Sequence, residues 1–190
     1  NEYSLTTAFD ISTSSYVQNF SVSAQESVPH ALAFSNDGTK MYISGSSYPN
    51  VYAYNLSTAF DVSSASFVGN PQGQFWVQMQ DISPTGITFN NDGKKMFMIG
   101  YSKDNVNEYN LSTAFDISTA SFGQLFSVAG QETVPSGVQF NNDGSKMYVI
   151  GLIGDAVNEY SLGDPAVQTV CVNDAITDIT YNTTGATAVS

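Results

Sequence analysis

The sequence predicts an all-β repeat protein, and three observations support this fold class. A segment of about fifty residues recurs three times. The composition, with only 12% charged residues and many Ser, Thr, Asn, Gln and Gly, suits strands and turns rather than helices. Short segments also alternate apolar and polar residues, which is the period of a strand with one buried face. The spacing of 51, 55 and 51 residues is marked by Tyr3, Tyr54, Tyr109 and Tyr160.

Each repeat contains four expected strands. In the third copy these are NEYNL, ASFGQLFSV, PSGVQF and KMYVIG, in chain order. An STAFD turn follows the first strand, and an Asn-Asp-Gly turn joins the last two. Asn and Gly tolerate the positive φ angles of tight hairpins, so the second turn is a strong hairpin signal.

The last strand of each repeat is apolar on both faces. In the third copy, Met147 and Val149 lie on one face, and Tyr148 and Ile150 lie on the other. Such a strand must be covered on both sides, and stacking one four-stranded sheet against the next achieves this. We therefore predict β-propeller-type blades, with repeats at about 1–52, 53–107 and 108–162. An open β-solenoid is the structural alternative.

Three blades are too few to close a ring, because propellers usually have about four to eight. We therefore expect either further blades of the same chain or self-association through the open blade faces. The four extra residues of the middle copy, NPQG at 70–73, predict a lengthened hairpin loop between Phe67 and Phe75.

The chain changes character after residue 162. Residues 163–190 lose the repeat and are predicted to form a linker and the beginning of a β-sandwich module, too short for a core of its own. The one cysteine, Cys171, lies in this segment, so no internal disulfide is expected in the chain.

Charge excludes several classes of partner. The net charge is −12, and the five basic residues are all lysines. Phosphate backbones and anionic membrane surfaces require clustered basic residues, so we expect neither nucleic-acid binding nor membrane binding. No apolar run approaches the ~20 residues that span a bilayer. An acidic surface without arginine fits an extracellular or cell-surface protein.

The acidic residues of the repeats recur in equivalent positions. A carboxylate that recurs in successive blades is expected to build the blade as a turn or cap, because a reaction needs one asymmetric constellation. We therefore predict that the chain is not an enzyme. The equivalent sets are Glu2 with Glu108 and Glu159, Asp10 with Asp61 and Asp116, Glu26 with Asp81 and Glu132, Asp37 with Asp92 and Asp143, and Asp104 with Asp155.

Other site chemistries find little support. The single histidine, His30, is predicted at a surface edge, and no nucleophile motif accompanies it. One histidine and one cysteine cannot form a zinc site. The oxygen-rich NNDG turns leave calcium open as a cofactor, although turn chemistry explains them without a metal.

Four aromatic residues lie near expected strand or loop ends: Trp76, Phe75, Tyr48 and Tyr101. Such rings can stack on sugars, which makes glycans or other surface ligands the expected partners. The surroundings of Trp76 are where the second copy differs most from the others. If the chain has a private binding site, we expect it there.

The repeat V-x-E-Y-x-L-S-T-A-F-D…N-N-D-G-x-K-M-Y-V-x-G resembles propeller-like repeats of large surface proteins from marine and gliding Bacteroidetes. Similar repeats occur in virion proteins of marine phages. The resemblance covers residues 1–162, and it implies no catalytic residues. Residues 168–187, QTVCVNDAITDITYNTTGAT, resemble the start of PKD-like or Ig-like modules of flavobacterial adhesins.

By this resemblance, we expect a non-enzymatic repeat module of a large cell-surface adhesin. Export by the type IX secretion route and a role in gliding motility are implied in the same way. A structural segment of a phage fibre is one alternative, and a secreted carbohydrate-active propeller is another.

Overall fold

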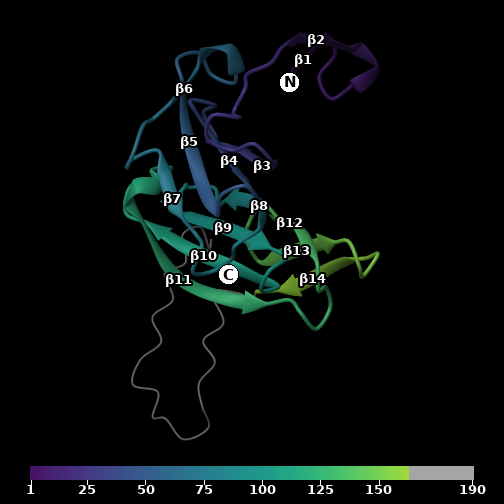
Figure 1. The fold of residues 1–190 in the computed structure, drawn as a ribbon. Helices are drawn as coiled ribbons and strands as arrows, with labels where there is room; N and C mark the ends of the chain where they lie inside the picture. Colours follow the sequence, from purple (N-terminus) through teal and green to yellow (C-terminus); the bar gives the residue numbers. More distant parts are fainter. Residues whose placement is uncertain (163–190) are drawn as a thin grey trace, which may run out of the picture.

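The computed structural model describes residues 1–162, and within this range the regular structure is strands and three short 3-10 helices (Figure 1). No helix in this part of the chain is long and apolar enough to cross a membrane. The predicted linker, the β-sandwich segment and Cys171 lie outside the described residues. The all-β prediction is confirmed.

The strands form one hairpin and three larger sheets. The N-terminal hairpin consists of β1 (Glu2–Leu5) and β2 (Ser14–Gln18), with the 3-10 helix η1 (Ile11–Thr13) between them. The first sheet contains β3 (Pro29–Phe34), β4 (Lys40–Gly45), β5 (Asn50–Leu56), β6 (Ala65–Phe67) and β7 (Gln74–Trp76). The second sheet contains β8 (Pro84–Phe89), β9 (Lys95–Gly100), β10 (Asn105–Leu111) and β11 (Ala120–Ser127). The third sheet contains β12 (Pro135–Phe140), β13 (Lys146–Gly151) and β14 (Val157–Ser161).

All pairings within these sheets are antiparallel, and each sheet combines the end of one sequence repeat with the start of the next. Strand β5 itself crosses from Tyr52 to Ala53, where the first period ends. The two remaining 3-10 helices, η2 (Val62–Ser64) and η3 (Ile117–Thr119), lie between the third and fourth strands of their sheets. The boundaries of each sheet are therefore shifted by about half a repeat from the boundaries of the sequence repeats.

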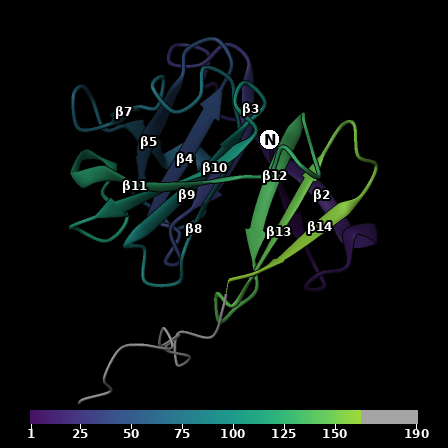
Figure 2. The same ribbon diagram turned by 90° about the horizontal axis from the view of Figure 1, so that it is seen from below.

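The three sheets stack face to face in chain order, as Figure 2 shows from below. Strand β9 of the second sheet is buried on both sides. Met96 and Met98 lie in the core shared with the first sheet. Phe97 and Ile99 lie in the core shared with the third sheet, together with Val149. The expectation that such a strand is covered on both faces is confirmed for β9. On the equivalent strand β13, Met147 and Val149 are buried, but Ile150 on the other face is 49% exposed, because no further sheet among the described residues packs there.

The NPQG segment does not form a hairpin loop, which corrects the expectation drawn from the sequence. Strands β6 and β7 do not pair with each other; both pair with β5, in line along the same edge. Residues 68–73 are thus an excursion within a single fourth strand, equivalent to the continuous β11. The turn-forming residues interrupt the strand, and the strand resumes after them because β5 supplies pairing partners on either side of the excursion.

A recurrent contact between phenylalanine and glycine holds the turns at one end of the sheets. Phe60 and Phe115 adopt positive φ angles of 61° and 57°, which is rare for a bulky side chain. A Cβ added to Gly93 would overlap the Phe115 ring, and a Cβ added to Gly38 would overlap the Phe60 ring. Glycine thus leaves room for the ring of the Ala-Phe-Asp turn.

Candidate functional site

The two ends of the sheets carry different kinds of connection. The turn face, as we call it, contains the Asn-Asp-Gly turns and the Ala-Phe-Asp turns, which are nearly the same in all copies. The loop face contains the loops 46–49, 101–104 and 152–155, with the connections 77–83 and 128–134. The loops read SSYP, YSKD and LIGD, so the copies differ most at this face. Repeats that differ on a common scaffold are a typical place for binding residues.

A buried carboxylate supports each loop of the loop face. Glu26, Asp81 and Glu132 are almost fully buried. Each accepts one backbone N–H from its own segment and one or two from the loop that follows the second strand of the sheet. Asp81 accepts from Ser83 (2.7 Å) and from Lys103 (3.1 Å).

The glutamates of the other two sheets act in the same way. Glu26 accepts from the backbone N–H groups of Val28 (2.8 Å) and Ser47 (3.0 Å). Glu132 accepts from Val134 (2.8 Å) and from Gly154 (2.9 Å). The carboxylate therefore accepts the loop N–H groups that a neighbouring strand would otherwise bind. Because it bonds only the backbone, the loop side chains are free to vary.

The glycine that ends the second strand makes this arrangement possible. A Cβ at Gly100 would lie 2.5 Å from the Asp81 Cγ, and a Cβ at Gly45 would lie 2.6 Å from the Glu26 Cδ. Gly151 has the same relation to Glu132. The final glycine of the KMYVIG motif is thus required by a close approach rather than by a positive φ.

Two carboxylates at this face, Glu132 and Asp104, have shifted pKa values. The backbone N–H bonds from Val134 and Gly154 lower the pKa of Glu132, because they stabilise its charged form. Burial, and then the nearby charges of Asp81 and Glu132, raises the pKa of Asp104. The loop face therefore gathers negative charge between the second and third sheets.

Three of the four predicted aromatic residues lie on the loop face. Trp76 is 64% exposed and Tyr48 is 60% exposed. They come from adjoining segments, since the Val77 N–H donates to the Pro49 carbonyl (3.0 Å). Tyr101, also exposed, starts the equivalent loop of the second sheet.

The loop of Tyr101 is fastened to the segment that follows Trp76. The Lys103 Nζ donates to the Met79 carbonyl oxygen (2.7 Å). Met79 is itself 84% exposed. Exposed apolar and aromatic side chains from two sheets are therefore held on one end of the molecule.

Phe75 belongs to the core instead. Its ring packs edge-on against buried Tyr109, with the ring centroids 5.2 Å apart, and it borders the core between the first two sheets. Because neighbouring residues of a strand point to opposite faces, Trp76 faces outward where Phe75 faces inward. The structure thus gives these two predicted residues different environments.

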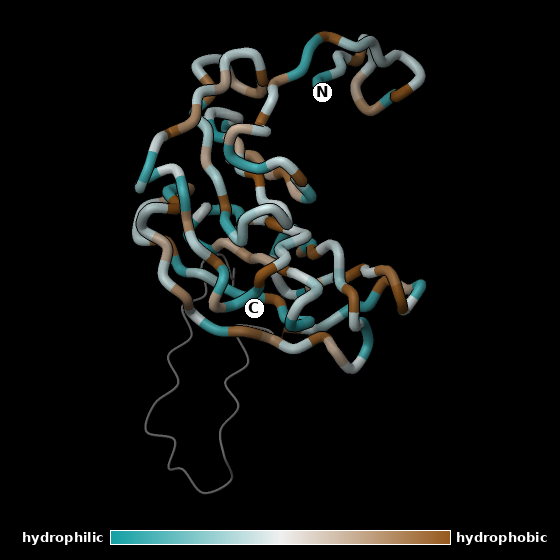
Figure 3. Tube along the Cα trace, viewed as in Figure 1, coloured by the Kyte–Doolittle hydropathy of each residue, from teal (hydrophilic) through white to brown (hydrophobic). Residues whose placement is uncertain are grey.

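Sequence reasoning missed Leu152 and Ile153, which occupy the equivalent loop of the third sheet. Both are exposed, and Figure 3 shows the hydrophobic colour at the outer end of the β13–β14 loop. Comparison of the three loops within the sequence could have found them. Hydrophobic residues stand there where the first copy has Ser46 and Ser47.

The turn-face carboxylates are engaged by the backbone that they cap. Asp10, Asp61 and Asp116 accept from the N–H groups two residues later, at the starts of the 3-10 helices. Asp37 and Asp92 do the same within the Asn-Asp-Gly turns. Among residues 1–162 no group of three His, Cys, Asp or Glu side chains could hold a metal ion.

His30 lies exposed on β3, where its Nε2 is 3.1 Å from the Ser46 Oγ. It is therefore placed at the surface edge of the first sheet, near the loop face. Among the described residues, this hydroxyl is its side-chain hydrogen-bond partner.

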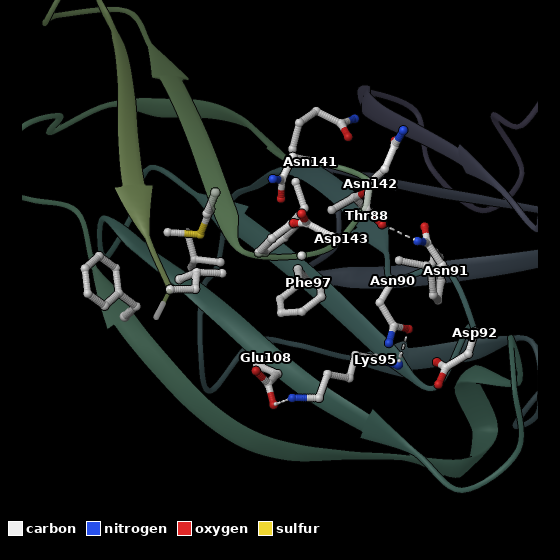
Figure 4. Close-up of a pocket in the computed structure, with 18 of the residues that line it drawn as sticks. Thr88, Asn90, Asn91, Asp92, Lys95, Phe97, Glu108, Asn141, Asn142 and Asp143 are labelled. Carbon is white, nitrogen blue, oxygen red and sulfur yellow. Dashed lines mark hydrogen bonds and ion pairs between the residues drawn. The ribbon is translucent and has the colours of Figure 1, made fainter. Parts of the chain in front are cut away.

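A cavity of about 820 Å³ lies between the second and third sheets at the turn face (Figure 4). Its lining includes Phe97, Phe140 and Gly144, together with the ion pair between Lys95 and Glu108 (2.8 Å). None of the predicted aromatic residues lines it.

Comparison with known proteins identifies the fold. No protein-family model and no curated protein matches the chain. Solved structures do match. A Bacteroides uniformis protein assigned provisionally to the 6-phosphogluconolactonases has a TM-score of 0.56 at 14% identity, over 77% of this chain and 41% of its own. The β-propeller domain of Cps50 (Swd1) from Myceliophteria thermophila has a TM-score of 0.51 at 12% identity, over 71% and 40%.

Hydrazine synthase from Kuenenia stuttgartiensis matches with a TM-score of 0.52 at 20% identity, over 78% of this chain and 36% of its own. At such identities the matches show the fold alone. The chain has a β-propeller-type fold without a closed ring among its described residues, and it spans about two-fifths of these matched structures.

Proposed function

We propose that this chain is a non-catalytic, ligand-binding module of a large extracellular surface protein of the adhesin type, and that it binds through the loop face. One observation carries the proposal. The buried carboxylates recur in every sheet, while the exposed residues of the loops that they hold differ from sheet to sheet. Such an arrangement keeps the scaffold constant and lets the contact residues vary.

The exposed residues are of the kind that bind neutral or weakly polar surfaces. Trp76, Tyr48 and Tyr101 offer rings with a polar edge, which suit stacking on the apolar face of a sugar. The acidic surroundings disfavour anionic polymers. A neutral glycan is therefore the ligand class that the loop face fits best.

The carboxylates offer a further reason to prefer binding over hydrolysis. Glycosidases place two carboxyl groups on either side of a bond, free to reach the substrate. Here Glu26, Asp81 and Glu132 are buried, and each is occupied by backbone N–H groups of its own sheet. Type IX secretion and a part in gliding motility remain parts of the proposal that rest on the sequence resemblance.

A glycan array with a hydrolysis readout tests the proposal. We expect retention of neutral glycans without product release, and at least about 10-fold weaker binding for Trp76→Ala and Tyr48→Ala. Tyr16→Ala is the matched control, because Tyr16 is equally exposed but lies in β2, away from the loop face. Product release would favour the carbohydrate-active alternative, and equal effects of all three variants would contradict the assignment of the face.

A further inference from the structure

The cavity of Figure 4 occupies a place that is filled between the other pair of sheets. Between the first and second sheets, Phe115 of the Ala-Phe-Asp turn stands in this position. Its carbonyl oxygen accepts from the Lys40 Nζ (3.1 Å) and from the Tyr42 hydroxyl. Its ring packs on Phe89, with the centroids 5.5 Å apart, and covers Gly93.

The walls of the cavity are the repeat equivalents of these contacts. Lys95 and Phe97 correspond to Lys40 and Tyr42, and Phe140 and Gly144 correspond to Phe89 and Gly93. Among the described residues, nothing lies within 4 Å of a Cβ added to Gly144. The cavity is thus lined by the equivalents of the residues that contact Phe115, although Phe97 lacks the hydroxyl that Tyr42 donates.

The sequence of the chain itself does not supply an Ala-Phe-Asp turn at the expected distance. After NEYSL at residues 158–162, the position equivalent to Phe115 is Ala166, and the position equivalent to Asp116 is Val167. A phenylalanine with no glycine partner does occur elsewhere in the chain.

Phe9, in the N-terminal hairpin, is fully exposed. It holds the same left-handed conformation as Phe60 and Phe115, with φ at 62°. Within the described chain β1 pairs only with β2, so its other edge has no strand partner. Figure 1 shows the hairpin standing apart from the three sheets.

The hairpin is nevertheless fastened to the first sheet as the outer half of a neighbouring sheet would be. The Gln18 Nε2 donates to the Asp61 Oδ1 (2.7 Å), and the Val62 N–H donates to the Glu2 Oε2 (3.0 Å). Phe20, just after β2, packs edge-on against Tyr54, as Phe75 does against Tyr109 of the next sheet.

We propose that two copies of this chain join head to tail, with the β1–β2 hairpin of one copy completing the third sheet of the other and Phe9 covering Gly144. The hairpin brings its own NEYSL strand, identical in sequence to residues 158–162, so that β1 takes the place of β14. Glu2 then replaces Glu159 as the partner of Lys146. Exchange of an identical element between copies costs little in contacts.

The same joint covers exposed apolar residues of the end sheets. Ile150 on β13 and Leu32 on β3 are exposed, whereas their equivalents Ile99 and Ile87 are buried between stacked sheets. Each copy contributes three sheets, so two head-to-tail joints would give a six-bladed ring, within the usual range of about four to eight.

Sedimentation velocity on the 190-residue chain and two variants tests the joint. Phe9→Asn removes the ring at an exposed site, and Gly144→Asn blocks the cavity; Asn tolerates positive φ, so neither should unfold the chain. We expect a wild-type dimer and at least about 10-fold weaker association for each variant. Met79→Asn and Gly69→Asn are matched controls, since Met79 is exposed, and Gly69 has positive φ and open surroundings.

Mixing the two variants gives the decisive measurement. The hairpin of the Gly144→Asn chain and the third sheet of the Phe9→Asn chain are both intact. The mixture should therefore form a one-to-one complex through one intact joint, at concentrations where each variant alone is monomeric. A wild-type chain that stays monomeric at all soluble concentrations would overturn the proposal. So would association that survives both substitutions, or a mixture that does not associate. Glycan binding by the monomeric variants is unaffected by this outcome, which separates the joint from the proposed function.

Discussion

The two ends of each sheet differ in which residues recur from copy to copy. On the turn face, both the capping aspartates and the residues around them recur, so the face is nearly the same in every copy. On the loop face, the buried carboxylate and its glycine recur, as do Gln80 with Gln131 and Asp104 with Asp155, while the other positions of the loops SSYP, YSKD and LIGD differ. The difference teaches that one repeat can carry both a fixed structural edge and a variable surface. A buried side-chain acceptor can hold loops of different sequence, because it bonds only their backbone.

Removal of the loop-face carboxylate should strongly reduce stability. Asp81→Ala leaves the N–H groups of Ser83 and Lys103 without their acceptor, which we expect to cost about 2–3 kcal/mol. Asp92→Ala, on the turn face, removes one exposed bond from the Lys94 N–H and should cost well under about 1 kcal/mol. Urea unfolding measures both values. Equal costs would contradict the distinction between the two faces.

The Phe–Gly contact of the turn face allows a second comparison. Gly93→Ala places a methyl group in the Phe115 ring at a φ of 69°, and we expect a loss of about 2–3 kcal/mol. Gly144→Ala has the same left-handed backbone but open surroundings among the described residues, so about 1 kcal/mol is expected. Thermal unfolding at low protein concentration compares the two. A Gly93→Ala variant as stable as Gly144→Ala would show that the ring does not hold the turn.

The equivalent tyrosines provide a smaller test at the loop face. The Tyr54 hydroxyl donates to the Gln25 side chain (3.0 Å), next to Glu26, and Tyr54→Phe should cost about 1 kcal/mol. The Tyr109 hydroxyl is buried without a partner in the described chain, and burial raises its pKa. Tyr109→Phe should therefore be neutral or slightly stabilising. A loss of stability in Tyr109→Phe would reveal a partner for this hydroxyl.

Acid should weaken both faces gradually. Hydrogen bonds from the Ser35 hydroxyl and then the Thr39 N–H lower the pKa of Asp37 to about 2, and backbone bonds lower the pKa of Glu132. Because these pKa values are lower in the folded state, their stabilisation is complete above the ordinary carboxyl pKa. It is lost as the pH falls from about 4 towards 2. Melting temperatures recorded across this range should fall, and Asp37→Asn should reduce the slope. A slope that Asp37→Asn leaves unchanged would mean that this turn carboxylate contributes nothing to the acid dependence.

Sequence patterns predicted the all-β class, the four strands per repeat and the burial of both faces of strands such as β9. These features follow from local periodicity. A repeat makes such periodicity easier to recognise, because every copy has the same pattern. The NPQG segment was predicted less well. Turn residues indicate that a strand is interrupted, but they do not indicate whether the two flanking pieces pair with each other or with a common neighbour.

The candidate site was predicted only in part. Aromatic residues near loop ends were visible, and Tyr48, Trp76 and Tyr101 do lie on the loop face. Phe75 and Trp76 are adjacent in sequence, and only the orientation of β7 decides which ring faces the core. Leu152 and Ile153 were overlooked because they are ordinary apolar residues until their loop is known to be exposed.

By itself, the sequence determined the repeat, the strand content and the positions of the recurrent acids, because periodicity and turn chemistry act over a few residues. The tertiary structure decided which repeat halves share a sheet and that Glu26, Asp81 and Glu132 bond loops about twenty residues away. It also decided that, among residues 1–162, no side chain covers Gly144 while Phe9 is exposed. Those facts depend on contacts between segments distant in the chain. No local pattern encodes such contacts, since the same NEYSL sequence pairs with β2 at residues 1–5 and with β13 at residues 158–162.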